Sequence, residues 1–201
     1  MRTEIYGSQI VLKAYEASFI PMLFEAAIEA RGGEFTRWMP WRHENYTMEE
    51  SRTFVEKTVE NRHDSEDIWR PDSQFGYAIF DSKAEKFLGG IGLNQPNAGH
   101  KFYNLGYWVR PSAQNRGIAS RATRLPANAA FEDLPLNRIE ILAAVENIPS
   151  RKRRKRQART TKEFCENASL SAAEFTTRRF FRLSAKIFII KPASRKFFYF
   201  C

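Results

Sequence analysis

Hydrophobic positions in the first 150 residues follow first the period of a strand, then that of a helix. β-branched residues between Gln9 and Lys13 predict a short strand. Apolar residues recur at helical spacing from Ser18 to Ala30, and Gly32 and Gly33 end this predicted helix. The elements predicted after it are a helix opened by the capping-box pattern Thr47 to Glu50, strands over 74–80, 87–93 and 102–109, a helix over 117–134 and a strand over 138–145.

The order of these elements predicts the fold class. Three consecutive strands between residues 74 and 109 favour hairpin connections and antiparallel pairing. The strand–helix–strand unit over 102–145 predicts one parallel crossover, which is right-handed by rule. We therefore expect an α/β (α+β) fold with a mixed, mostly antiparallel sheet and flanking helices. Pro126 lies inside the last predicted helix, where it should kink the helix or cost about 3 kcal/mol.

Charge divides the chain near Arg151. The 201 residues carry a net charge of +9, yet residues 1–150 carry −3 and residues 151–201 carry +12. Eight of the 17 phenylalanines and both cysteines also lie in the second part. We expect one domain over 1–151 and a basic tail over 152–201 without a native fold.

Composition excludes several classes of protein. No stretch approaches the roughly 18 apolar residues of a membrane span, and the N-terminus lacks the apolar run of a secretory signal. Two cysteines, Cys165 and Cys201, are too few for a disulfide framework or a four-ligand zinc site. We therefore expect no metal, and we expect a cytoplasmic location. The three histidines stand in polar segments and are interpreted as surface residues; they are His43, His63 and His100.

The segment after the strand over 102–109 carries candidate chemistry. Pro111 forbids further strand pairing, and Gln114 to Ala119 lead into the next helix. Backbone N–H groups at such a helix start lack intrahelical partners and suit a phosphate or pyrophosphate. Gly117 would let the anion approach, and Arg116 would add charge. A glycine that merely eases a tight strand-to-helix turn fits the spacing equally well.

The stretches "LGYWVRPSAQNRGIASRA" and "LNRIEILAAVENIPS" resemble the GNAT acyltransferases. The resemblance covers about residues 8–151 and is strongest to the RimJ/RimL-like branch, which acetylates N-terminal α-amines of ribosomal proteins. It rests on a Q-x-x-G-x-A turn, the "LNRIE" strand entry and "NxxS", in that order.

The resemblance implies acetyl-CoA as cosubstrate and assigns roles along the chain. Val109 would pair through its backbone with the pantetheine arm, in a gap between the strands over 102–109 and 138–145. Asn147 would contact the cofactor, and Trp38 and Trp41 would border the acceptor site. The pyrophosphate would be held by Gln114, Asn115, Arg116, Gly117, Ile118 and Ala119.

The implied reaction is direct acyl transfer from the thioester to a primary amine. Ser150 is the candidate that protonates the leaving thiolate, although a helix N-cap explains this serine equally well. The general base is not identifiable, since Glu140 on the last strand is interpreted as a member of a structural pair. The expected acceptor is a protein N-terminus, with spermidine, an antibiotic amine or another small amine as alternatives.

The tail departs from the family pattern, which requires a helix and two closing strands after "NIPS". A basic run over 151–156 stands there instead, typical of nucleic-acid binding, so nucleic acid is a partner only if the tail is functional. We interpret residues from about Lys152 as a frameshift product, because a one-base shift of suitable codons yields a family-like string. The strand over 138–145 would then be an unpaired, partly uncovered edge, and the chain would aggregate and have little activity. The alternative is a non-catalytic cofactor-binding remnant or a basic-tailed RNA-associated protein.

Overall fold

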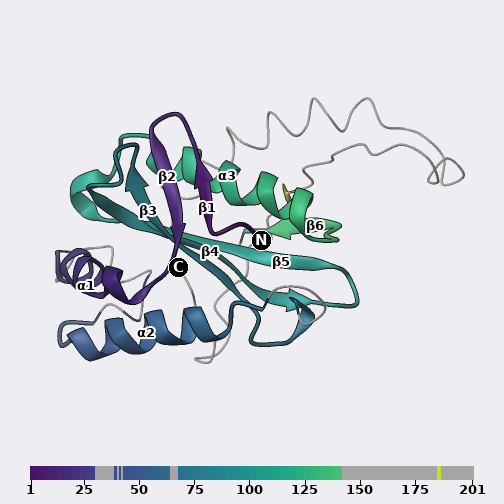
Figure 1. Cartoon of the computed structure of the whole chain (residues 1–201), viewed down its shortest axis with the longest axis horizontal. Helices are drawn as coiled ribbons and strands as arrows, with labels where there is room; N and C mark the ends of the chain where they lie inside the picture. Colours follow the sequence, from purple (N-terminus) through teal and green to yellow (C-terminus); the bar gives the residue numbers. More distant parts are fainter. Residues whose placement is uncertain (30–38, 40, 42, 64–67, 142–184, 187–201) are drawn as a thin grey trace, which may run out of the picture.

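The computed structural model describes residues 1–29, 39, 41, 43–63, 68–141 and 185–186, and these residues form a curled mixed sheet with helices on both faces (Figure 1). The strands of the described chain pair in sequence order, antiparallel from β1 to β5 and parallel from β5 to β7. They are β1 (Glu4–Tyr6), β2 (Ile10–Ala14), β3 (Phe75–Asp81), β4 (Phe87–Asn97), β5 (Phe102–Val109), β6 (Arg138–Glu140) and β7 (Ala185–Lys186). The expected mixed, mostly antiparallel sheet is confirmed, and so is the parallel pairing of the two strands joined by the crossover.

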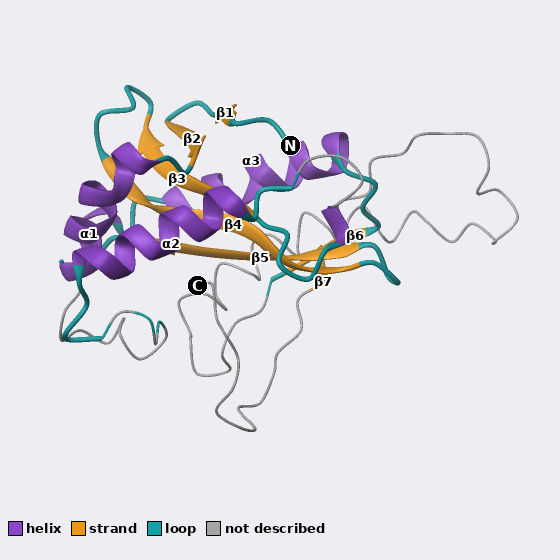
Figure 2. Cartoon of the chain, turned by 60° about the horizontal axis from the view of Figure 1, so that its bottom comes forward, coloured by secondary structure: helices purple, strands orange, loops and turns teal. Residues whose placement is uncertain are grey.

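The helices form two layers around this sheet. Helices α1 (Ile20–Ile28) and α2 (Met48–Glu60) lie together on one face, and α3 (Ile118–Asp133) covers the other. Figure 2 brings α1 and α2 in front of the strands. Short 3-10 turns precede α1 (Ala17–Phe19) and α3 (Pro111–Ala113).

Helices therefore shield both faces of the sheet from water, and β3 carries apolar side chains on both faces. Tyr77 and Ile79 pack in the cluster under α3, whereas Ala78 and Phe80 pack in the cluster under α1 and α2. Neighbouring residues of a strand point to opposite faces, so a strand covered on both sides is apolar throughout.

The capping box predicted at the start of α2 is present. The Thr47 hydroxyl accepts a hydrogen bond from the Glu50 N–H at 3.3 Å, and the Glu50 carboxylate accepts from the Thr47 N–H at 2.8 Å. These reciprocal bonds satisfy two N–H groups that the first turn of the helix leaves unpaired.

The structure adds one strand to the predicted elements and shows how Pro126 is accommodated. Strand β1 was not predicted, because three residues are too short for a periodic signal, yet it pairs with β2 with Ile5 opposite Leu12. Pro126 lies inside α3 as predicted, and the helix continues to Asp133 with the proline buried on its sheet-facing side. Burial of the ring against the core offsets part of the cost of the missing N–H.

The expectation of an unpaired last edge is wrong for the described part of that strand. β7 pairs with β6, with Ile139 opposite Ala185 and Glu140 opposite Lys186. Ile139 is 2% exposed and thus not uncovered. The predicted extension of this strand over 142–145 lies outside the described residues.

Candidate functional site

The residues expected to hold a pyrophosphate come together at the carboxyl end of β5. The chain leaves the strand at Val109, passes through the short 3-10 turn and enters α3 through Asn115 and Gly117, both with left-handed backbone (φ 62° and 73°). Among the described residues, no acceptor pairs with the backbone N–H groups from Asn115 to Ser120. A helix start with free N–H groups and the positive end of the helix dipole fits an anionic group such as a pyrophosphate. We call residues 114–120 the anion cradle.

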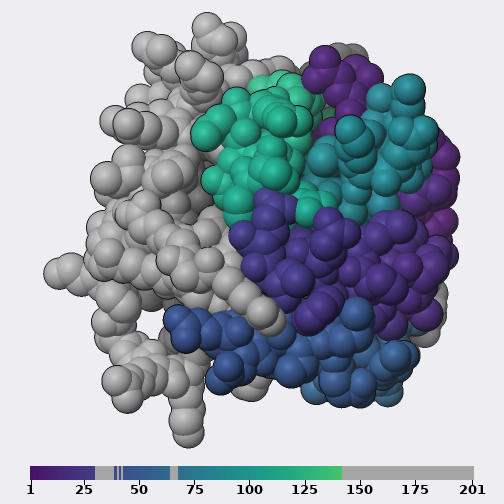
Figure 3. Space-filling view, turned by 90° about the vertical axis from the view of Figure 1, so that its left-hand side faces the viewer, coloured from purple at the N-terminus to yellow at the C-terminus, as the bar shows by residue number. Residues whose placement is uncertain are grey.

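An ion-pair network anchors the chain just before the anion cradle. Arg110 Nη2 lies 2.9 Å from Glu25 Oε1, the Arg110 guanidinium also pairs with Glu29, and the Ser112 N–H donates to Glu29 Oε1 at 2.6 Å. Burial by itself raises the pKa of the Glu29 carboxyl, but the hydrogen bonds from Ser112 and Arg110 outweigh it, so this pKa lies below its usual value. Two carboxylates therefore neutralise Arg110 and fasten the cradle to the end of α1. Figure 3 looks at this end, where α1 (purple) lies between α2 (blue) and the green surface that leads into α3.

Two further arginines carry the positive charge of the cradle. Arg116 is exposed, and no carboxylate of the described chain pairs with it. Arg121, which the sequence analysis did not single out, turns back along α3, and its Nη2 donates to the Arg116 carbonyl at 2.6 Å. Its position four residues after Gly117 was the available signal, because helical side chains lean toward the helix N-terminus.

Strands β5 and β6 pair in parallel over their described residues, and the part of the second strand that would border the expected gap, over 142–145, lies outside the described residues. Their recorded pairs are Phe102–Arg138, Tyr103–Ile139 and Asn104–Glu140, all at the start of each strand. The Arg110 N–H donates to Leu88 of β4, so the alternation of a strand turns the backbone groups of Val109 to the β6 side. The Val109 carbonyl there accepts from Gln114 Nε2 at 3.2 Å, which joins two of the expected cofactor residues.

A furrow lies beside β5 on the face of the sheet that α1 and α2 cover. Gly76, Gly92 and Gly106 stand opposite one another on β3, β4 and β5, so three neighbouring strands carry no side chain at this level. Glycine inside a strand often marks a place where a ligand or another backbone approaches closely. The enclosed part measures about 20 Å³, and the furrow is lined by Tyr15, Phe54, Gln74, Gly76, Gly90, Ile91, Gly92, Leu93, Asn94, Gly106, Tyr107 and Trp108.

The polar groups of the furrow are neutral. The Tyr15 hydroxyl is buried without a hydrogen-bond partner, and burial raises the pKa of this phenol, so it stays protonated at neutral pH. Asn104 Nδ2 donates to Asn94 Oδ1 at 2.9 Å, while Asn104 Oδ1 is buried and unpartnered. Such orphaned groups cost free energy unless a water or a ligand satisfies them.

Trp41, expected to border the acceptor site, does not line the furrow itself but packs against Trp108, which does. Its ring centroid lies 5.6 Å from that of Trp108 and 5.8 Å from that of Tyr46. Trp38, Asn147 and Ser150 lie outside the described residues. The structure thus gathers Val109 and the predicted residues from Gln114 to Ala119 at one end of β5, with Trp41 on the α1–α2 face.

The remaining sequence interpretations concern isolated polar residues. His43 is exposed, and its Nε2 lies 2.8 Å from Glu50 Oε1. His63 is half-buried, with its Nε2 buried 3.8 Å from Asp72 Oδ1. Glu140 pairs with Arg138 at 2.6 Å, as interpreted from the sequence. Within the described ranges, no cluster of metal-ligating side chains occurs and no helix has the length and apolarity to cross a membrane.

Known proteins resemble this chain in sequence and in fold. YdaF of Bacillus subtilis, whose name marks it as a candidate ribosomal N-acetyltransferase, is 38% identical over 63 residues, which cover 31% of this chain and 34% of that protein. The chain thus matches about a third of the length of this curated relative. RimL, a ribosomal L7/L12 α-N-protein acetyltransferase in complex with coenzyme A, superposes with a TM-score of 0.63 at 20% identity, over 75% of this chain and 79% of its own. A spermidine N-acetyltransferase from Vibrio cholerae, in complex with CoA and spermine, gives a TM-score of 0.58 at 17% identity, over 75% and 80%.

At these identities the solved structures establish the fold. The family model described as "Acetyltransferase (GNAT) domain" matches residues 10–156, which is well over half of the chain. The predicted family and acetyl-CoA as cosubstrate are both confirmed. The parallel pairing of β5 with β6, the left-handed turn at the start of α3 and this family match lead to one conclusion: the chain belongs to the GNAT acetyltransferase family.

Proposed function

We propose that this GNAT acetyltransferase transfers an acetyl group from acetyl-CoA to the N-terminal α-amine of a protein. The observation that carries the proposal is the uncharged furrow on one side of β5, opposite the anion cradle at the end of the same strand. A cofactor along the edge of β5 and an acceptor on its face would meet beyond Asn104, the last residue of β5 that pairs with the described part of β6. Holding both reactants in one geometry is a large part of what such an enzyme contributes.

The cofactor end of the proposed site uses the residues that the geometry gathers. The free N–H groups of residues 115–120 and the charge of Arg116 would hold the pyrophosphate. The Val109 backbone, turned away from β4, would pair with the pantetheine arm. Acetyl-CoA supplies an activated thioester carbonyl when bound. Asn147 and Ser150 remain proposed as cofactor contact and proton donor.

The acceptor end favours a peptide over a polyamine. The lining of the furrow within the described chain contains amide, aromatic and aliphatic side chains and no carboxylate. A polyamine buries several positive charges and needs acidic partners, because an unpaired buried charge is costly. A protein N-terminus brings one amine, and the amides behind it can pair with neutral groups such as Gln74 and Asn94.

The size of the furrow also bears on the acceptor. A volume of about 20 Å³ is only slightly more than the roughly 10–15 Å³ that a cavity needs to hold one water molecule. It therefore suits a small first residue, such as alanine or serine, better than a leucine or phenylalanine. Trp41, packed on Trp108, would border the peptide where it leaves the furrow.

A direct assay tests the proposal. Release of the CoA thiol is followed with acetyl-CoA and either a ribosomal-protein peptide that begins with alanine or serine, the same peptide with a blocked N-terminus, or spermidine. Acetylation of the free peptide at its α-amine, located by mass spectrometry, supports the proposal. Turnover of spermidine alone would overturn the choice of acceptor, and no turnover with any amine would favour the non-catalytic alternative.

We also propose that the enzyme domain ends near residue 151 and that residues 152–201 are an out-of-frame tail. The family match, which ends at residue 156, supports a boundary in this region. The nucleotide sequence is the test: a single-base change near codon 152 must restore a family-like helix and two strands. Salt-sensitive RNA binding that is lost on truncation at Arg151 would instead make the tail a functional element.

A further inference from the structure

Arg121 is placed over the floor of the anion cradle by one hydrogen bond and one close approach, and it keeps one unused donor. Its Nη2 donates to the Arg116 carbonyl at 2.6 Å. Its Nη1 lies 3.2 Å from where a Cβ on Gly117 would stand. Its Nε is buried and has no hydrogen-bond partner. The guanidinium thus covers the glycine whose missing side chain leaves the cradle open.

The charge of Arg121 is uncompensated, unlike that of Arg110. The ion pairs of the described chain place Glu25 and Glu29 on Arg110 and no carboxylate on Arg121. Its recorded acceptor is a neutral carbonyl. A phosphate oxygen is a better acceptor for a guanidinium than a carbonyl is, because the bond is charge-assisted and two adjacent N–H groups can bind side by side.

We propose that Arg121 is a phosphate-binding residue of the cofactor site, which exchanges the Arg116 carbonyl for a phosphate oxygen of coenzyme A. Nε, now without a partner, and Nη2 form the two-pronged donor that a phosphate accepts. This inference rests on the proposed position of the cofactor at residues 114–120. Arg121 adds a contact from helix α3 to those proposed for the backbone N–H groups and for Arg116.

Binding measurements without turnover test the assignment. Calorimetry with coenzyme A and with adenosine 3′,5′-bisphosphate, the portion that carries two of its three phosphates, compares the unaltered chain with Arg121→Gln and Arg121→Lys. Arg124→Gln is the matched control, since Arg124 is exposed on the same helix and its change removes the same charge. We expect Arg121→Gln to weaken both ligands at least about tenfold, Arg121→Lys to weaken them less, and Arg124→Gln to have little effect.

Salt separates a phosphate contact from a merely structural role. The difference in affinity between the unaltered chain and Arg121→Gln should shrink as ionic strength rises, because salt screens the attraction between Arg121 and the phosphate. A distorted loop would bind coenzyme A poorly at every salt concentration. If Arg121→Gln unfolds, the lysine variant carries the same comparison against Arg124→Gln. Equal affinities of the Arg121 and Arg124 variants would overturn the inference while the cradle stands. Failure of the unaltered chain to bind coenzyme A, or an unchanged affinity in Gly117→Val, would instead refute the cradle itself.

Discussion

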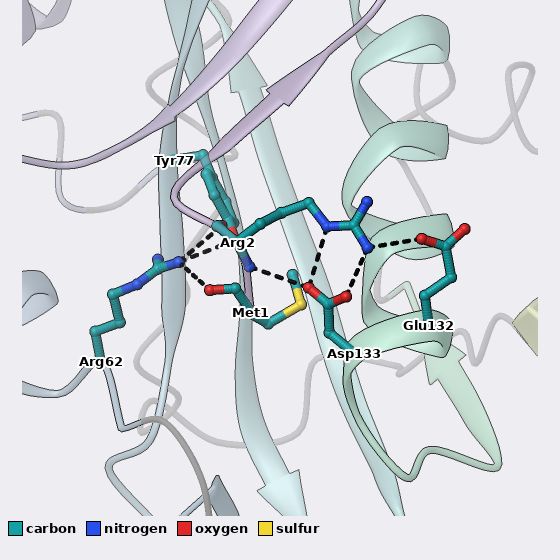
Figure 4. A network of polar contacts seen from close by, with 6 residues as sticks. All are labelled: Met1, Arg2, Arg62, Tyr77, Glu132 and Asp133. Carbon is teal, nitrogen blue, oxygen red and sulfur yellow. Dashed lines mark hydrogen bonds and ion pairs between the residues drawn. The ribbon is translucent and has the colours of Figure 1, made fainter.

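Arg2 Nη2 lies 2.6 Å from Asp133 Oδ1, so an ion pair joins residues that stand 131 positions apart (Figure 4). The same guanidinium reaches Glu132 at 2.7 Å, and the Arg2 N–H donates to Asp133 Oδ2 at 3.0 Å. Arg62 Nη2 in turn donates to the Arg2 carbonyl at 2.9 Å. The last turn of α3 is thereby tied to the N-terminal segment, while its first turn carries the anion cradle. The orientation of the cradle depends on both ends of this helix.

Removal of this tie should cost stability without touching the site directly. Arg2→Ala is expected to lower the free energy of unfolding by about 0.5–1.5 kcal/mol, since the ion pair is half-exposed and its hydrogen bonds are charge-assisted. Arg52→Ala, which removes an exposed pair with Glu49 at 3.3 Å, is the control and should cost less. Urea unfolding measures both. Equal losses would mean that the Arg2 contacts contribute no more than an ordinary surface pair.

The decrease of the unfolding free energy at acid pH should depend in part on the Asp133 carboxylate. The hydrogen bond from Arg2 is the main cause that lowers the pKa of Asp133 in the folded chain. A lowered folded pKa contributes stability that is present above the ordinary Asp pKa of about 3.9 and is lost as pH falls through the folded value. The gap in unfolding free energy between the unaltered chain and Asp133→Asn should thus be constant from about pH 7 to pH 5 and narrow below about pH 4. A gap that stays unchanged at pH 3 would contradict the assignment.

Glu29 is expected to matter for cofactor affinity although it lies outside the cradle. Glu29→Gln weakens the bonds to Arg110 and Ser112 that fix the strand end. We expect coenzyme A to bind about tenfold more weakly, equivalent to about 1.4 kcal/mol, because the cradle is then less preorganised. Glu25→Gln is the matched control, since Glu25 shares Arg110 but its side chain is 68% exposed. Calorimetry on both variants should separate them, and indistinguishable affinities would show that the anchor does not reach the site.

Gly117 and Arg116 should differ in how they affect acetyl-CoA binding. Arg116→Ala removes one charged contact and should cost about 1.5–3 kcal/mol of binding free energy. Gly117→Val should cost more, because its φ of 73° disfavours a branched side chain and a Cβ would crowd Arg121. Titration calorimetry with acetyl-CoA gives both values. Unchanged affinity in the two variants would place the pyrophosphate elsewhere.

Tyr15 offers a test of the furrow that leaves the cofactor site intact. Tyr15→Phe removes a buried hydroxyl that has no partner, so stability should be unchanged or rise by up to about 1 kcal/mol. If a peptide occupies the furrow, the KM for the peptide should rise while coenzyme A affinity stays the same. Steady-state kinetics and calorimetry together decide this. A lower stability with unaltered KM would make Tyr15 a core residue only.

Local sequence patterns by themselves determined the strands and helices with a clear period, and also the turn that begins α3. The strand over 102–109 was predicted to the residue, and the capping box at Thr47 was readable because its partners lie three positions apart. The loop of the cradle belongs to this class as well, because Pro111 follows the end of β5 and Gly117 precedes α3 as predicted, while its binding of a pyrophosphate stays a prediction.

Tertiary structure decided everything that depends on pairing between distant segments. Gly76, Gly92 and Gly106 reveal a furrow only when the register of three strands places them side by side, and a single glycine in a strand pattern signals little. Strand β1 and the tie from Arg2 to Asp133 likewise have no local period to detect. The role of Arg121 depends on which neighbour its long side chain reaches after the loop has folded. Periodicity records which face of an element is buried, but the chain must close on itself before distant groups define a site.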